Sequence, residues 1–145
     1  MYKLYIEKDI VSDDFFAKTC NMLGISDKVF YNEYGKPYFE NNDLFFNISH
    51  SGDYTVLVVS DKEIGVDIEK ISYKPNIIDR ICTENEKKTI HNADDFTKVW
   101  VKKESYVKWL GQGLPYGLNN VDTTRITNFD IKKIEDYYVC VYTEK

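Results

Sequence analysis

Apolar and polar residues alternate along much of the chain, and this alternation predicts its strands. A period of two is typical of a strand with one buried face, because successive side chains point to opposite sides. Two longer alternating stretches are each broken by a short polar turn, which predicts a hairpin; in the first the turn lies near Gly52-Asp53. The pattern predicts strands at 2–7 and 64–69 and hairpins at 44–60 and 129–143.

Other segments repeat their apolar residues every three to four positions, which predicts helices. Ser12 or Asp13 is expected to cap the first helix, and Thr83 with Glu86 has the spacing of a capping box for the second. Gly111 is expected to end the third, because glycine readily takes the left-handed conformation that closes many helices. The predicted helices cover 13–23, 83–91 and 95–110.

The sequence of the first predicted hairpin is repeated in similar form near the end of the chain. Residues 46–62 (FNISHSGDYTVLVVSDK) and 129–145 (FDIKKIEDYYVCVYTEK) align without gaps, 83 positions apart, with Phe, Ile, Asp, Tyr, two Val and Lys identical. Asp-Asp-Phe triplets at 13–15 and 94–96 stand at the start of two predicted helices at nearly the same separation. Any two alternating hairpins look somewhat alike, but two echoes at similar offsets favour an internal duplication.

A duplication predicts an α+β fold with two pseudo-symmetric halves, each a helix packed on a small antiparallel sheet. A chain of 145 residues, of which 43% are hydrophobic, is long enough for one domain with a buried core. We therefore expect a single domain over residues 1–145, with halves at approximately 1–62 and 63–145.

Composition and charge argue against several classes of function. Cys20, Cys82 and Cys140 are far apart and form no CxxC pair, which argues against a zinc site or a disulfide framework. A net charge of -5 disfavours nonspecific binding to nucleic acid. No apolar run has membrane-spanning length, and the charged, alternating N-terminus predicts a strand rather than a signal peptide. We expect a cytoplasmic protein that binds neither nucleic acid nor membrane.

Small polar residues interrupt the apolar pattern of the first hairpin. Ser49, His50, Ser51 and Gly52 lie where the second copy has Lys-Lys-Ile-Glu, so the alternating scaffold does not require them. Two hydroxyls, an imidazole and an open glycine backbone suit a phosphate, so one interpretation of the segment is a break in the strand that holds one. A polar hairpin loop with an exposed histidine is the alternative.

The strand at 64–69 carries two carboxylates on one face. Alternation places Asp67 and Glu69 together with Gly65, the backbones of the two acidic residues being about 7 Å apart. Both side chains are within reach of one divalent cation, and the glycine leaves room beside them. Magnesium typically binds a few carboxylates and completes its shell with water and phosphate. A solvated strand face is the commoner origin of such a pattern.

The longest predicted helix carries charges beside its apolar stripe. Glu104 and Lys108 lie one turn apart on the flank, which is also the spacing of a surface ion pair. Lys103 projects into the apolar arc, where a snorkelling stem is the structural explanation. Four lysines against one glutamate between 98 and 112 leave room for a local anion site. The side chains expected to face water are Lys98, Lys102 and Ser105.

Four segments occur together in the order and spacing of a known family. GKP (35–37), FNISHSG (46–52), IGVDIE (64–69) and WVKKESYVKWLGQGL (100–114) resemble the 4'-phosphopantetheinyl transferase superfamily, in its larger, pseudodimeric Sfp-type branch. The similarity covers about residues 34–121. The carboxylate strand combined with the WxxKExxxKxxGxGL helix is specific, whereas either element alone is weak. The two halves of this family also agree with the internal repeat.

The resemblance implies an enzyme that transfers the 4'-phosphopantetheine arm of coenzyme A to a serine of an acyl or peptidyl carrier protein. It implies Mg²⁺ ligands at Asp67, Glu69 and Glu104, with Glu104 also the general base and Lys108 binding phosphate and assisting the leaving oxygen. The implied contacts are Gly35, Lys36, Pro37, Ser49, His50, Ser51 and Lys108 for coenzyme A, and Gln112, Gly113, Leu114 and Pro115 for the carrier protein.

The N-terminal half departs from the family because it is short and carries few basic residues. Between 10 and 30 only Lys18 and Lys28 stand where the family has several basic contacts to the 3'-phosphate of coenzyme A, and Lys3 and Lys8 are candidate substitutes. A monomer is expected, with dimerisation as the alternative. The alternative function is a truncated, non-catalytic paralogue that holds coenzyme A or a carrier protein. An unrelated interaction domain is a third reading, which four ordered motifs disfavour.

Overall fold

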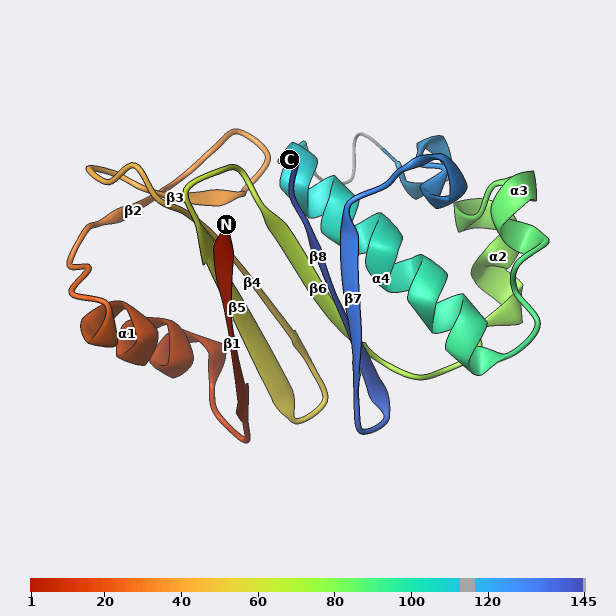
Figure 1. The fold of residues 1–145 in the computed structure, drawn as a ribbon, viewed down its shortest axis with the longest axis horizontal. Coiled ribbons are helices and arrows are strands. Elements are labelled where there is room, and N and C mark those ends of the chain that lie inside the picture. Colours follow the sequence, from red (N-terminus) through yellow and green to blue (C-terminus); the bar gives the residue numbers. More distant parts are fainter. Residues whose placement is uncertain (113–116, 145) are drawn as a thin grey trace.

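The computed structural model describes residues 1–112 and 117–144 as two α+β halves packed against each other (Figure 1). The first half contains β1 (Tyr2–Lys8), α1 (Ser12–Met22), β2 (Val29–Tyr31), β3 (Pro37–Phe39), β4 (Phe45–Ser51) and β5 (Tyr54–Ser60). The second contains β6 (Gly65–Lys70), α2 (Pro75–Ile81), α3 (Glu84–Lys87), α4 (Ala93–Leu110), the 3-10 turns η2 (Leu118–Asn120) and η3 (Thr123–Arg125), β7 (Phe129–Ile134) and β8 (Tyr137–Tyr142).

Each half forms an antiparallel sheet with the same strand order. The sheets are β1-β5-β4 and β6-β8-β7, so the last strand of each half is the central one. Phe46 pairs with Val59 in the first hairpin, and Phe129 pairs with Tyr142 in the second. The two hairpins therefore keep one register along the 83-residue offset of the sequence repeat. The α+β fold with two pseudo-symmetric halves is confirmed, whereas the boundary at 62/63 stays a prediction that falls in the link between β5 and β6.

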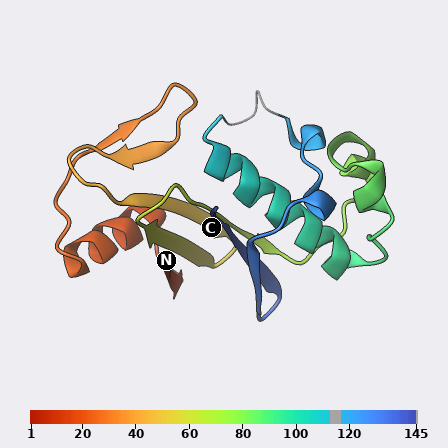
Figure 2. The ribbon, with the colours of Figure 1, turned by 45° about the horizontal axis from the view of Figure 1, so that its top comes forward.

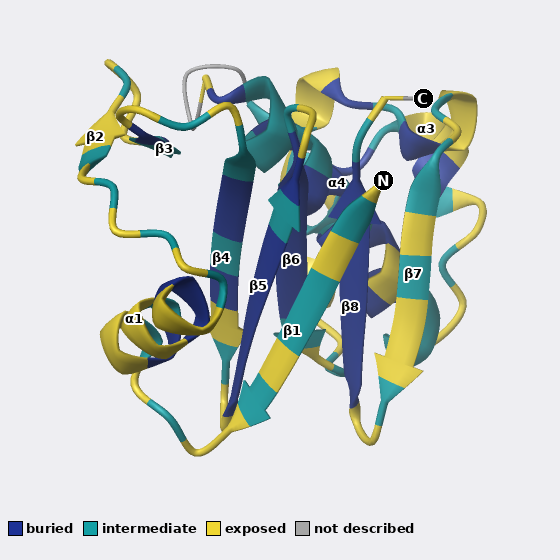
Figure 3. Ribbon diagram, turned by 60° about the vertical axis from the view of Figure 1, so that its left-hand side comes forward, coloured by how far each residue is buried: buried dark blue, intermediate teal, exposed yellow. Residues whose placement is uncertain are grey.

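The two sheets face each other and bury the main core between them, with α1 and α4 on the outer sides (Figure 1). Valine and isoleucine side chains of β5, β6 and β8 fill this core, and these three strands are buried along most of their length (Figure 3). Each such side chain contributes about 1.5–3 kcal/mol when it is fully buried. Separate clusters hold the helices: Phe15 of α1 packs near Phe46 and Leu57, and Val101 of α4 packs on Tyr138 and Cys140.

Helix α4 begins and ends at residues that satisfy its backbone. The Asn92 side chain accepts a hydrogen bond from the Asp95 amide, and Gly111 closes the helix with a φ of 71°. The helix lies directly on β6, because a Cβ on Gly65 would come within 2.1 Å of the Ser105 carbonyl oxygen. Gly65 therefore makes room for the helix backbone and not for a ligand. Ser105, which was expected to face water, is fully buried beneath this contact.

Several local predictions were wrong. Strand β4 runs unbroken through Ser49 and His50 to Ser51, because its backbone pairs with β5 along that whole stretch. Val11 is the N-cap of α1 and provides no side-chain hydrogen bond, so neither Ser12 nor Asp13 caps it. The capping box of Thr83 is present, but its helix covers only four residues. The ribbon β2–β3 and helix α2 have no counterpart among the predicted elements because each is short.

The ribbon β2–β3 leans over the C-terminal end of α4 (Figure 2). The side-chain Nδ2 of Asn32 donates a hydrogen bond of 2.8 Å to the Gly111 carbonyl, and the side-chain Oδ1 accepts from the backbone amides of Tyr34 and Lys36. This asparagine folds the turn of the ribbon and fastens it to the helix end. Among the helices in the described part of the chain, none is long and apolar enough to cross a membrane.

Candidate active site

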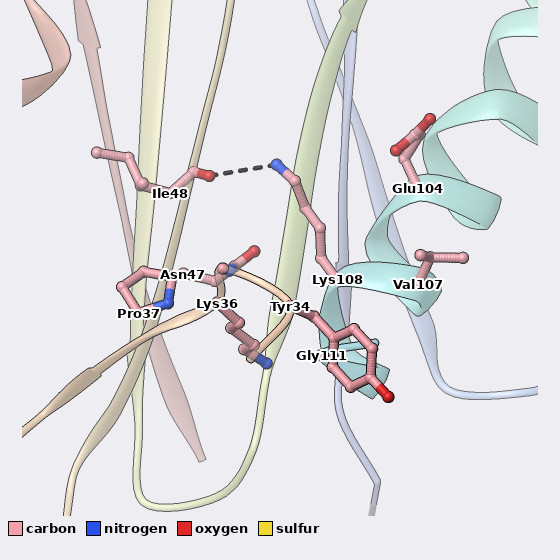
Figure 4. A pocket seen from close by; sticks show the side chains of 10 residues that line it. Tyr34, Lys36, Pro37, Asn47, Ile48, Glu104, Val107, Lys108 and Gly111 are labelled. Atoms are coloured by element: carbon pink, nitrogen blue, oxygen red, sulfur yellow. Dashed lines mark hydrogen bonds between the residues drawn. The ribbon is translucent and has the colours of Figure 1, made fainter. Parts of the chain in front are cut away.

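A cavity of about 310 Å³ lies where the first half meets the C-terminal part of α4 (Figure 4). The first half supplies residues 34–37 of the ribbon turn together with Asn47 and Ile48 of β4. Helix α4 supplies the other wall, with Glu104, Val107, Lys108 and Gly111. The structure thus brings the predicted Gly-Lys-Pro segment together with the predicted acid–base pair, although 67 positions separate Pro37 from Glu104.

Asp67 is a buried carboxylate at the seam between β4 and β6. Only 4% of the residue is exposed, and its Oδ1 accepts a hydrogen bond of 3.0 Å from the Ser49 hydroxyl. Its Oδ2 is buried without a hydrogen-bond partner. Burial raises the pKa of Asp67 well above its ordinary value, Lys108 opposes the shift, and the nearby charges of Glu69 and Glu104 add to it. A carboxylate held in this way favours a cation beside it.

The other two predicted metal ligands lie near Asp67. The Glu69 Oε1 accepts a hydrogen bond of 3.0 Å from the indole N–H of Trp100 on α4. Burial raises the pKa of Glu104, and Glu69 adds to the shift whereas Lys108 opposes it. Each of the three carboxylates therefore lies within the electrostatic field of another. Over residues 1–112 and 117–144, however, no three acidic, histidine or cysteine groups converge closely enough to form a ready metal site.

Lys108 spans the seam between the halves. Its Nζ donates to the Ile48 carbonyl of β4 at 3.2 Å and to the Val66 carbonyl of β6 at 3.1 Å. It also lies 3.7 Å from Asp67 Oδ1. The ammonium thus turns toward the strands, away from the carboxylate of Glu104 (Figure 4). It is partly exposed at the cavity, where it is accessible to an anion.

Because side chains alternate along β4, the two serines of the Ser-His-Ser segment point to one side of the strand and the histidine to the other. Asn47 Oδ1 accepts from the Val66 amide, Ser49 Oγ from the Ile68 amide and Ser51 Oγ from the Lys70 amide. These three side chains join β4 to β6 in a ladder of side-chain to backbone hydrogen bonds. His50 is exposed on the opposite side, beside the start of α1. The two serines and the histidine therefore do not line one common pocket.

Lys36 lines the cavity, but its ammonium group points away from it. Its Nζ contacts Glu63 Oε1 at 2.6 Å and the carbonyl oxygens of Ile64 and Trp109. Burial lowers the pKa of Lys36, although the Glu63 carboxylate opposes this shift. A nucleotide contact through its side chain stays a prediction. Of the predicted carrier-protein contacts, Gln112 is exposed, whereas Gly113, Leu114 and Pro115 lie outside the described residues.

The snorkelling explanation for Lys103 was wrong, because its ammonium pairs with Glu86 at 2.6 Å and both side chains are fully buried. Glu86 also accepts from the Thr83 amide and from the amide and hydroxyl of Thr123. The lysines between 98 and 112 therefore form no single patch: Lys103 is in this network and Lys108 is at the cavity. The position of Lys103 inside the apolar arc was the feature of the sequence that could have predicted a buried acidic partner.

Carboxylates and a lysine beside a cavity form the kind of site that holds phosphate groups with a divalent cation. A family model of the 4'-phosphopantetheinyl transferase superfamily matches residues 63–142, which is more than half of the chain. The chain therefore belongs to the 4'-phosphopantetheinyl transferase superfamily.

Relatives of the Sfp type are similar to about three fifths of the chain. A 4'-phosphopantetheinyl transferase of Bacillus subtilis is 42% identical over 98 residues, which is 61% of this chain and 43% of the relative. The 4'-phosphopantetheinyl transferase gsp of Aneurinibacillus migulanus is 38% identical over 96 residues, 61% of this chain and 40% of the relative. Sfp of Bacillus subtilis strain 168 is 37% identical over 98 residues, 61% of this chain and 43% of the relative. The match thus spans about two fifths of these relatives, and the predicted Sfp-type membership is confirmed.

Proposed function

We propose that the protein transfers the 4'-phosphopantetheine arm of coenzyme A to a serine of an acyl or peptidyl carrier protein, in a Mg²⁺-dependent reaction. One observation carries the proposal: a single cavity is bounded by the ribbon turn at 34–37, by Glu104 and by Lys108. The names of the similar proteins support the same reaction class.

Glu104 is proposed as the general base. The serine oxygen attacks the phosphorus that carries the pantetheine arm, the pyrophosphate P–O bond breaks, and 3',5'-ADP leaves. Glu104 takes the proton of the attacking hydroxyl, directly or through water. Its burial supports this role, because the raised pKa makes the carboxylate a stronger proton acceptor than an exposed glutamate.

Lys108 is proposed to bind the phosphates and to stabilise the leaving oxygen. Its ammonium is partly exposed at the cavity and is held by carbonyl groups of both halves. An incoming phosphate attracts the ammonium more strongly than these neutral carbonyls do, because its oxygens carry negative charge. The backbone of residues 35–37 lines the same cavity and is the proposed nucleotide contact. Direct contacts from Ser49, His50 and Ser51 stay predictions.

Asp67, Glu69 and Glu104 are the proposed holders of Mg²⁺. The unpartnered buried Oδ2 of Asp67 and the mutual influence of the three carboxylates support this assignment. Bound Mg²⁺ supplies neutralisation of the charge that develops on the pyrophosphate during phosphoryl transfer. The protein itself contributes carboxylates on a rigid strand and a helix that fix where the phosphates lie.

The exposed Gln112 and the segment that follows it are the proposed contact with the carrier protein. Gln112 follows Gly111, which ends α4 and lines the cavity, so a carrier bound at Gln112 would present its serine near Glu104. A monomer in the cytoplasm remains the expectation. The alternative function, a non-catalytic descendant that holds coenzyme A or a carrier, is weaker because Glu104, Asp67 and Glu69 are all present.

The test is intact-mass spectrometry of one acyl and one peptidyl apo-carrier after incubation with this protein, coenzyme A and Mg²⁺. The expected result is a gain of one phosphopantetheine arm on a carrier, absent when a chelator is added. Calorimetry with coenzyme A and Mg²⁺ separates the alternative. Magnesium-dependent binding of coenzyme A without any mass gain on either carrier would favour the non-catalytic descendant.

A further inference from the structure

We propose that Ser49 and Trp100 are positioning residues for the paired carboxylates of β6, each binding one carboxylate oxygen and leaving the other oxygen to a divalent cation. The inference deepens the proposed function, on which it rests. It also gives Ser49 a role other than contact with coenzyme A, and it assigns a role to the tryptophan of the helix motif.

The hydrogen-bonding capacity of Ser49 fixes the direction of its proton. The Ser49 oxygen accepts the Ile68 amide at 3.3 Å, and the same oxygen lies 3.0 Å from Asp67 Oδ1. A carboxylate only accepts hydrogen bonds, so the hydroxyl proton must point at Asp67. The serine residue is 7% exposed, and its rotation is restricted by both bonds. The amide thus orients the hydroxyl, and the hydroxyl orients the carboxylate.

Trp100 performs the same task for Glu69 from the other side. An indole is a donor only, and its N–H lies 3.0 Å from Glu69 Oε1. The ring itself is held by Phe96, whose centroid is 6.0 Å away, and by the ammonium of Lys74, which lies 5.4 Å from its centroid. The donor is therefore fixed before any ligand arrives. Protein groups that bind a ligating carboxylate in this way set its orientation and its affinity for the metal.

Asp67 keeps one oxygen for a ligand. Asp67 Oδ2 is buried and has no hydrogen-bond partner, which is rare for a buried charged group. The two donors come from different elements, since Ser49 lies on β4 and Trp100 on α4. The geometry of the Asp-x-Glu pair is therefore set by both halves of the molecule, although both carboxylates lie on one strand.

Variants of Ser49 test the first donor. Their affinity for Mn²⁺ or Mg²⁺ is measured by calorimetric titration of the cation alone, without coenzyme A. Ser49→Val should weaken cation binding by about 10- to 100-fold, the usual effect of losing such a partner. The threonine of Ser49→Thr has the same size as the valine of Ser49→Val but keeps the hydroxyl. This variant should therefore retain the wild-type affinity for the cation. Ser51→Ala is the matched control, because Ser51 also accepts an amide of β6 but its hydroxyl contacts no carboxylate of the pair. Equal affinities for the Thr and Val variants would overturn the role of Ser49.

The two tryptophans of the chain offer a spectroscopic test of the second donor. In the Trp109→Phe variant the fluorescence comes from Trp100 alone, and it should change as Mg²⁺ saturates the site. Trp100→Phe keeps the ring packing but loses the N–H, so it should weaken cation binding by about 10-fold. Trp109→Phe, on the same helix, should leave the affinity unchanged. A Trp100→Phe protein with wild-type cation affinity would overturn the role of Trp100.

These measurements need neither coenzyme A nor a carrier, so they fail independently of the transferase proposal. Transfer by the wild-type protein together with unchanged cation affinity in Ser49→Val and Trp100→Phe overturns only the positioning roles. Weakened cation binding in both variants supports the positioning roles even if neither carrier gains mass. A wild-type protein that binds neither Mg²⁺ nor Mn²⁺ overturns the positioning inference, whereas the chelator control of the transfer assay tests the proposed metal dependence separately.

Discussion

The two hairpins of the molecule share one register but differ in what their outer strands meet. Strand β4 lies beside β6, and its Asn47 and Ser49 are buried in hydrogen bonds to that strand. At the matching positions β7 has Asp130 and Lys132, which are exposed on an open sheet edge. Lysine suits such an edge because it discourages further strand pairing. The same backbone thus became a seam in one half and a solvent-facing edge in the other, and the candidate site formed at the seam.

The largest difference between the seam and the open edge is expected when the carboxylate at the seam is changed. Asp67→Asn should abolish most of the transfer and remove its dependence on Mg²⁺, because a neutral amide is a poorer ligand for a hard cation than a carboxylate. Asp130→Asn on the open edge should leave the rate unchanged. Rates of carrier modification across a Mg²⁺ titration would check both variants. Magnesium-stimulated turnover in Asp67→Asn would mean that the metal is held elsewhere.

The next largest effect is expected on stability, when the buried ion pair of the second half is broken. Lys103→Met leaves the fully buried Glu86 without its cation and should cost about 3–5 kcal/mol of unfolding free energy. Lys102→Met, one position earlier and partly exposed, should cost almost nothing. Urea denaturation of both variants measures the difference. Equal midpoints for the two would show that the pair is not needed to hold α3 and η3 against α4.

The third change probes how closely each half packs its helix. Gly65 pairs with Tyr142 as Lys3 pairs with Val59, so the two occupy matching positions on β6 and β1. Gly65→Ala should cost about 3 kcal/mol, because its Cβ meets backbone atoms of α4 that cannot move separately. Lys3→Ala should be neutral, since Lys3 is exposed. Thermal unfolding compares them, and a tolerated alanine at Gly65 would contradict the close approach.

The smallest expected change in stability comes from substitutions at matching positions of the two hairpins. Ser49→Ala leaves the Ile68 amide of β6 without its acceptor and should cost about 1–2 kcal/mol. Lys132→Ala, at the matching position of β7, should change stability by less than about 0.5 kcal/mol. Denaturant unfolding resolves this difference. If both substitutions were neutral, the ladder between β4 and β6 would contribute little to the joining of the halves.

Regular patterns made most of the fold predictable, and tertiary contacts limited the rest. Long alternating or helical stretches located both hairpins and α4, and the repeat predicted the two similar halves. The role of Ser49 was not predictable from its neighbours, because the amide it accepts belongs to a strand 19 positions away. Lys103 was visible as a lysine in an unusual place, and Lys36 only as part of the Gly-Lys-Pro motif. Their partners Glu86 and Glu63 are distant in sequence. Sequence patterns indicate which residues matter, whereas packing decides what they contact.

The most direct test of the account compares the wild-type protein with Glu104→Gln and measures both products of one reaction. Modified carrier is quantified by intact mass and 3',5'-ADP by chromatography. The wild-type protein should give equal amounts of the two products, and Glu104→Gln should lose both while it remains folded. Near-normal yields from Glu104→Gln, or release of 3',5'-ADP without modified carrier, would contradict the claim that this cavity is a transfer site with Glu104 as its base.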